Sequence, residues 1–260
     1  MDYTHGSHWE TIIKDVESFF ETNLDDIIHN SFIASNYNEN GYNLAQDETI
    51  DNNIHILQYL ETKDNPIALT TIYINKALWT AYPSHNYGFK KDIIIDKVYD
   101  IGNLIEGLIS CHLAEYPDFS FTFFDTKYYE NKSKYTIGDR YSFIFAGYAY
   151  GVSESTMKNQ HIDIGNEKLN LDGISIFLAN ETGYLDDYKI NSKVLKVEDF
   201  ELLNNPMKAV VIQVLNTEDE TFRFPIFVAE HNIQDNYNIV VGEDISGGIW
   251  LTGLLNDANE

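Results

Sequence analysis

Alternation of side chains two residues apart constrains this chain more than any other feature. Three aromatic segments show it: FSFTFF (119–124), YSFIFAGYAYG (141–151) and TFRFPIFV (221–228). Two further apolar runs, GISIFLAN (173–180) and MKAVVIQVLN (207–216), are bounded by turn residues. Successive side chains of a strand point to opposite faces of its sheet, so this period of two predicts strands. Several short strands of this kind indicate an antiparallel sandwich or barrel.

The N-terminal part of the chain carries a different period. Apolar residues recur every three or four positions from Trp9 to Phe20, and LDDIIHNSFIA (24–34) continues the pattern, which predicts helix. The segment 67–82 is ambiguous, although its β-branched residues favour a strand. The sequence therefore predicts an α+β fold, in which a mainly helical N-terminal region (1–90) packs on a mainly antiparallel β-sandwich or barrel-like domain (91–260).

A recurring apolar-Gly-acid/amide pattern raises the question of a ligand loop. Its most complete copy, VGEDISGGIW, lacks the Lys-Ser/Thr ending of a phosphate loop and carries two acids that would repel phosphate. We therefore interpret the pattern as a way of entering a strand, with positive φ expected at Gly102 and Gly242. Gly107 and Gly247 fall inside strand patterns and predict bulges or bends. The four copies are 101–110, 137–143, 164–171 and 241–250.

Nucleophile and metal signals are weak. The single cysteine, Cys111, and the histidine that follows it would point to opposite faces of a strand, so a small buried cysteine is expected. His5 with His8, and His161 with Asp163, have spacings that could share a metal, but no third ligand is near either pair. The sequence therefore predicts no catalytic residue, no metal and no cofactor.

Carboxylates offer an alternative interpretation as a hydrolase. A glycosidase needs two carboxylates several ångströms apart in a cleft, and an acidic chain offers many candidate pairs. Asp125, directly after the aromatic strand FSFTFF, is the preferred one for a sugar site. Alternating phenylalanines are nevertheless more typical of the core face of a sheet.

Charge is the largest anomaly of the composition. The 260 residues include 41 acids and 17 bases, a net charge of −24. Phosphates repel such a surface, which argues against direct binding to nucleic acid or to an anionic membrane. The same field favours encounter with a basic partner. The absence of a signal-peptide pattern, of a long apolar stretch and of paired cysteines fits a cytoplasmic protein.

These observations predict a non-catalytic, acidic cytoplasmic protein that engages and inhibits a basic protein partner. An immunity or antitoxin-like protein and an inhibitor that imitates nucleic-acid charge share this physics. A hydrolase using Asp or Glu and a structural or assembly component are the alternatives, and the oligomeric state stays open. Acidic turns and their neighbouring tyrosines are the expected contacts. The partner-binding candidates are Tyr184, Asp186, Asp187, Tyr188, Glu218, Asp219 and Glu220.

Overall fold

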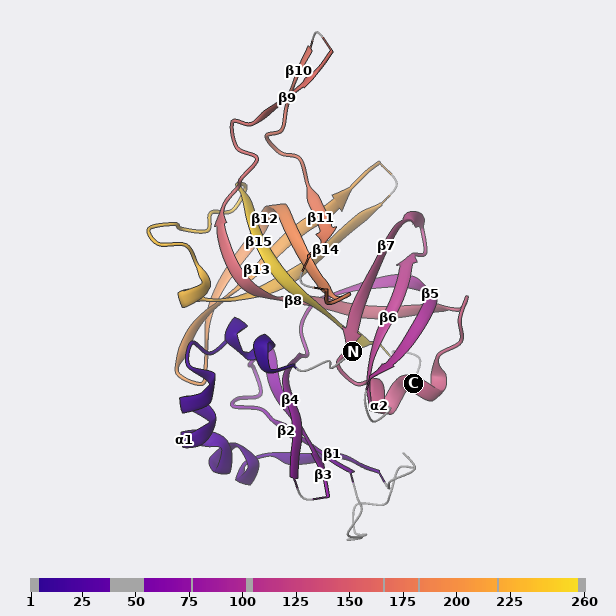
Figure 1. Ribbon diagram of the computed structural model, residues 1–260, viewed down its shortest axis with the longest axis vertical. Coiled ribbons are helices and arrows are strands. Elements are labelled where there is room, and N and C mark those ends of the chain that lie inside the picture. Colours follow the sequence, from indigo (N-terminus) through magenta and orange to yellow (C-terminus); the bar gives the residue numbers. More distant parts are fainter. Residues whose placement is uncertain are drawn as a thin grey trace.

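The chain folds mostly into β-strands, as the ribbon diagram shows (Figure 1). The N-terminal helices are a 3-10 helix, η1 (His5–Thr11), and one α-helix, α1 (Val16–His29). The side chain of Asp15 caps α1 by accepting a hydrogen bond from the backbone of Ser18. The computed structural model describes residues 5–37, 54–75, 77–101, 105–165, 167–181, 183–218 and 220–256.

The prediction of an α+β fold with a mainly helical N-terminal region is wrong. After α1 the chain forms a four-stranded antiparallel sheet, in the order β1-β2-β3-β4. Short apolar runs such as IHILQYL (54–60) fit a strand and a buried helix equally well, and tertiary pairing decides between them. The strands are β1 (Phe32–Tyr37), β2 (Ile54–Tyr59), β3 (Ile67–Ile74) and β4 (Ala77–His85).

A nine-stranded sheet forms the rest of the described fold, and the predicted strands of this part are confirmed. Its order is β11-β12-β13-β14-β8-β15-β7-β6-β5, and β9 (His161–Ile164) and β10 (Glu167–Asn170) form a separate hairpin that projects from the body (Figure 1). The nine strands are β5 (Phe89–Ile101), β6 (Glu106–Leu113), β7 (Tyr116–Asp125), β8 (Arg140–Glu154), β11 (Ile176–Ala179), β12 (Asp187–Leu202), β13 (Asn205–Asn216), β14 (Thr221–Ala229) and β15 (Asp244–Leu255).

Two additional pairings, β8 with β5 and β12 with β15, close this sheet into two rings. One ring is β5-β6-β7-β15-β8 and the other is β12-β13-β14-β8-β15. Each ring has five strands, as an OB-type barrel does, and begins with a meander of three strands. The third strand of the meander makes a parallel pairing: β7 with β15 in the first ring, and β14 with β8 in the second. The strand pair β8–β15, the shared ribbon, belongs to both barrels. β15, which follows the second meander in the chain, is thus part of the first barrel, and β8, which follows the first meander, is part of the second.

The two barrels repeat one arrangement in backbone detail. The N–H of Gly138 donates to the carbonyl of Ile95, and the N–H of Gly242 donates to the carbonyl of Val194, both at 2.8 Å. The N–H of Ile95 in turn donates to the carbonyl of Asp139 at 3.2 Å, and the N–H of Val194 donates to the carbonyl of Glu243 at 2.9 Å. The strand register also shifts directly after each partner residue. The sequence segments that correspond are therefore 137–143 and 241–247, and not 101–110 and 241–250.

Short helices lie between the third and fourth strand of each barrel. They are α2 (Tyr128–Asn131) with η2 (Lys132–Lys134) in the first barrel and η3 (Glu230–Asn232) in the second. Their presence at the same place in both barrels extends the repeat. The two barrels thus share a meander, a helical turn and a return strand.

The shared ribbon separates two hydrophobic cores. Phe143 and Phe145 of β8 point into the core enclosed by the barrels. Ala146 and Tyr148 of the same strand point to the second core, between the ribbon and the N-terminal sheet. His85 of β4 joins the N-terminal sheet to the ribbon, since its ring nitrogens lie 3.0 Å from the carbonyl of Ile144 and 3.1 Å from Oγ1 of Thr252.

The glycine predictions have different outcomes. Gly242 has a φ of +92°, as expected, whereas Gly102 lies outside the described residues. Gly247 lies next to a register shift of the ribbon, and a Cβ there would be 2.3 Å from the carbonyl oxygen of Gly151. Gly107 marks no bulge; its lack of a Cβ leaves room for the ring of Tyr128, 2.6 Å from the position of an added Cβ.

Replacing Gly242 by valine is expected to destabilise the protein by about 1 kcal/mol or more, because a β-branched residue resists a positive φ. Nothing crowds the position of an added Cβ, so the cost is conformational. Urea unfolding monitored by circular dichroism measures it. Asparagine tolerates positive φ better, so Gly242→Asn serves as the control with a smaller loss. Equal stability of the valine variant and the wild type would contradict the turn interpretation.

Candidate functional site

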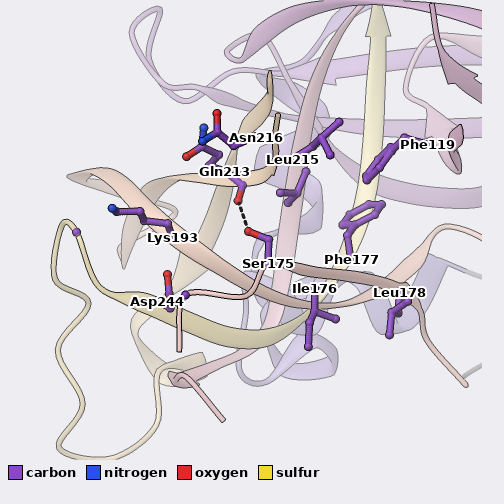
Figure 2. A pocket seen from close by; sticks show the side chains of 13 residues that line it. Phe119, Ser175, Ile176, Phe177, Leu178, Lys193, Gln213, Leu215, Asn216 and Asp244 are labelled. Carbon is purple, nitrogen blue, oxygen red and sulfur yellow. Dashed lines mark hydrogen bonds between the residues drawn. The ribbon is translucent and has the colours of Figure 1, made fainter. Parts of the chain in front are cut away.

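A groove opens at the end of the second barrel, between β11 and the C-terminal end of β13 (Figure 2). Its cavity volume is about 810 Å³, which is in the range of binding sites for small molecules and short peptide segments. Figure 2 shows the rings of Phe119 and Phe177 together on one side and Lys193 and Asp244 on the other. The apolar part of the lining is Phe119, Ile176, Phe177, Leu178, Val214 and Leu215.

The groove forms because β12 changes its partner along one edge. Tyr188 to Asn191 of β12 pair with β11, whereas the strand from Lys193 onwards pairs with β13. The opposite edge of the first half of β12 is occupied by β15. β11 and the end of β13 therefore diverge from a common base, where Oγ of Ser175 donates to the carbonyl of Gln213 at 3.3 Å.

One end of the groove is acidic. A smaller adjoining pocket of about 280 Å³ shares Gly173, Gly242 and Asp244 with the groove. Together they hold four carboxylates, of Glu154, Asp172, Glu243 and Asp244, against the ammonium groups of Lys158 and Lys193. The net charge of these six side chains is 2 − 4 = −2.

Two of the acidic side chains have defined local contacts. Lys158 forms an ion pair with Glu154. The amide of Asn170 and the backbone N–H of Asn159 bond to Asp172 and lower the pKa of its carboxyl. Asp172 therefore stays ionised below the usual pH range of an aspartate, and the acidic end keeps its charge.

At the equivalent end of the first barrel, ion pairs stand in the place of the groove's acidic end. Arg140, which corresponds in register to Asp244, forms ion pairs with Asp92 at 2.7 Å and with Glu115 at 2.9 Å. His112 lies 2.9 Å from Asp96 at the same end. In the second barrel, the segment between β8 and β12 adds β11, which lines the groove.

The predicted acidic turn at Asp186 and Asp187 is buried rather than exposed. The indole N–H of Trp250 donates to Asp186 at 2.7 Å, and the hydroxyl of Tyr150 donates to Asp187 at 2.9 Å. Tyr188 is buried as well, and its ring stacks on Phe177 with 4.2 Å between centroids. These residues hold the start of β12, and they are not available as surface contacts.

Tyr184, which completes the first predicted cluster, is half-buried. The acids of the second predicted cluster, 218–220, differ in their exposure. Glu218 is exposed, and Asp219 lies outside the described residues. Glu220 is buried, where it forms an ion pair with Lys91 and accepts a hydrogen bond from the backbone of Thr221 at 2.7 Å. Of this cluster the structure places only the side chain of Glu218 at the surface.

Asp125, the candidate for a sugar site, is fully buried beneath the turn that contains α2. Burial raises the pKa of its carboxyl to about 6, although hydrogen bonds from Tyr135, at 2.5 Å, and from the backbone of Lys127, at 3.0 Å, oppose the rise. A substrate has no access to this carboxylate. Its role is to anchor the end of β7 to the following turn.

The remaining candidates from the sequence lie in separate parts of the fold. Cys111 is buried and free, as expected, and burial raises the pKa of its thiol well above the usual range. His8 stacks on Trp250, and His161 with Asp163 lies exposed on the projecting hairpin. Within the described ranges no group of three or more His, Cys, Asp or Glu could hold a metal, and no helix is long and apolar enough to cross a membrane.

Sequence reasoning identified the strand in GISIFLAN but not the groove beside it. The groove depends on which neighbours β12 chooses along its length, and no local pattern encodes that choice. Two short acidic segments, LDG (171–173) and VGED (241–244), each stand next to an apolar strand. They are the signal in the sequence for the acidic end of the groove. Comparison of the chain with protein-family models, with curated proteins and with solved structures gives no match.

Proposed function

We propose that the protein is a non-catalytic binding protein, and that the groove between β11 and β13 holds a basic segment of a partner protein. The observation that carries this proposal is the groove itself: an apolar slot that ends in four carboxylates opposed by two lysines, on a chain of net charge −24. A segment with apolar side chains followed by lysine or arginine complements both parts.

The two parts of the groove have different energetic roles. Aromatic and aliphatic side chains such as Phe119, Phe177 and Leu178 offer apolar area, which supports affinity and slow dissociation. Exposed ion pairs contribute only about 0–1 kcal/mol each. The acidic end therefore acts mainly on association rate and on the choice of partner, and raised salt weakens that effect.

Lys90, Lys91 and Arg223 line another pocket, and two of these three basic residues have partners within the protein. Near the start of β5 and β14, Lys91 is paired with Glu220 and the guanidinium of Arg223 lies over the ring of Phe89 at 4.6 Å. The strand number shared with OB-type barrels says nothing by itself about a ligand. Binding of a basic segment inhibits the partner protein if the partner uses that same segment to bind its own target.

Selection from a displayed library of linear twelve-residue peptides tests the proposal directly. Peptides enriched on the wild-type protein are expected to carry lysine or arginine next to apolar residues. The double variant Glu243→Lys, Asp244→Lys should weaken their binding at least about tenfold, because it reverses two of the four carboxylates. The dissociation constants are measured by fluorescence anisotropy at two salt concentrations.

A matched control carries the same change of net charge elsewhere. Glu17 and Glu21 are exposed on α1, which lies away from β11 in Figure 1, so Glu17→Lys with Glu21→Lys should leave binding within about twofold of wild type. Enrichment of neutral or acidic peptides, or equal loss of binding in both double variants, would contradict a basic partner at this groove.

A further inference from the structure

The groove lies between two strand edges that no other strand covers in the described part of the chain. β11 pairs only with β12, and the end of β13 beyond Gln213 pairs only with β14. Because both are antiparallel to β12, they run parallel to each other. The backbone N–H and C=O groups along these two edges face the same groove.

Unpaired strand edges are sites at which another extended chain can add. The structure partly closes this opening at its base, where the hydroxyl of Ser175 reaches the carbonyl of Gln213. Beyond that point the edges diverge around the apolar floor formed by Phe119, Phe177 and Leu215 (Figure 2). Leu178 on β11 remains 61% exposed, which is a large apolar area for a residue at a sheet edge.

We infer that the partner segment enters the groove as an added β-strand between β11 and β13, antiparallel to both, with its basic residue at its C-terminal end. The inference rests on the proposed function, since it names how the same groove binds its partner. Backbone hydrogen bonds to the two edges supply affinity, and alternate side chains fill the apolar floor.

The direction follows from the position of the acidic end. Gly173, which precedes β11, lines both the groove and the acidic pocket, so the carboxylates lie at the N-terminal end of β11. A strand antiparallel to β11 reaches that end with its C-terminus. Since β11 has four residues, the added strand spans roughly 13 Å, at about 3.3 Å per residue.

The probe for this inference is a fluorescein-labelled heptapeptide of alternating valine and threonine that ends in two lysines. Two further versions carry N-methyl groups on one or the other alternate set of backbone amides, which removes the donors towards one edge. Each methylated peptide should bind the full-length protein about tenfold more weakly than the parent, as expected for the loss of about two backbone hydrogen bonds. Moving the two lysines to the N-terminus should also weaken binding about tenfold.

Charge and backbone are separated by a fourth peptide, in which two glutamates replace the lysines. If the lysine peptide binds much more tightly than the glutamate peptide, but both methylated peptides bind as tightly as the parent, strand addition is overturned and the proposed function stays in place. Equal binding of the lysine and glutamate peptides, with sensitivity to both methylations, supports strand addition and overturns the basic partner. Failure of all peptides to bind contradicts both.

Discussion

Replacing Trp250 by alanine is expected to destabilise the folded protein by about 4 kcal/mol, as for other large side chains removed from a core. The indole is fully buried on the shared ribbon, and its N–H donates to Asp186 at 2.7 Å. Its ring stacks on His8 at 4.0 Å and contacts Phe124 and Tyr148, each at 5.4 Å. Alanine would leave a cavity at the junction of the N-terminal segment, both barrels and the start of β12.

Trp250→Phe separates packing from hydrogen bonding in the same place. Phenylalanine retains most of the apolar volume but no donor for Asp186, so we expect a loss of about 1–3 kcal/mol. Urea unfolding of both variants, followed by circular dichroism, gives the two free energies. A loss below about 1 kcal/mol for Trp250→Ala would show that the indole does not hold this junction together.

Asp125→Asn is expected to change the pH dependence of stability by about 3 kcal/mol. Burial raises the pKa of Asp125 from 3.8 to about 6, and each pKa unit is equivalent to about 1.4 kcal/mol. Between these values the folded protein keeps a proton that the unfolded chain releases, so stability from this group falls as pH rises through about 6. Asparagine cannot titrate, and it retains an oxygen that can accept from Tyr135.

A second buried group acts in the opposite direction. Burial lowers the pKa of His85 from 6.5 to about 4, although its bond to the carbonyl of Ile144 opposes the change. The unfolded chain therefore binds the proton first, and stability from His85 is present above pH 6.5 and falls as pH decreases. The total pH profile contains both effects, so only the difference between wild type and Asp125→Asn isolates the carboxyl.

The measurement is urea unfolding of both proteins at intervals from pH 4 to pH 7.5. The free energy of wild type minus that of the variant should decrease by about 2.5 kcal/mol across this range, with most of the change below pH 6.5, because the rest of the effect lies below pH 4. Parallel profiles would mean that Asp125 has an ordinary pKa. His85 is unchanged in both proteins and cancels in the difference.

The sequence by itself determined those features that depend on neighbouring residues. Alternation predicted the strands that contain FSFTFF, YSFIFAGYAYG and TFRFPIFV, because the faces of a strand are set by consecutive side chains. The glycine of VGED predicted the positive φ of Gly242, because other residues avoid that region. The burial of Cys111 followed from its apolar strand context. Each of these properties is encoded within a few residues.

Tertiary structure alone decided the features that require distant segments to meet. The N-terminal strands formed where helix was expected, because pairing in a sheet overrode short ambiguous runs. Asp186 and Asp187 became buried because Trp250 and Tyr150 supply donors from strands far along the chain. The groove exists because β12 exchanges β11 for β13 along one edge. Choice of partner strand is a long-range property, and local periodicity carries no information about it.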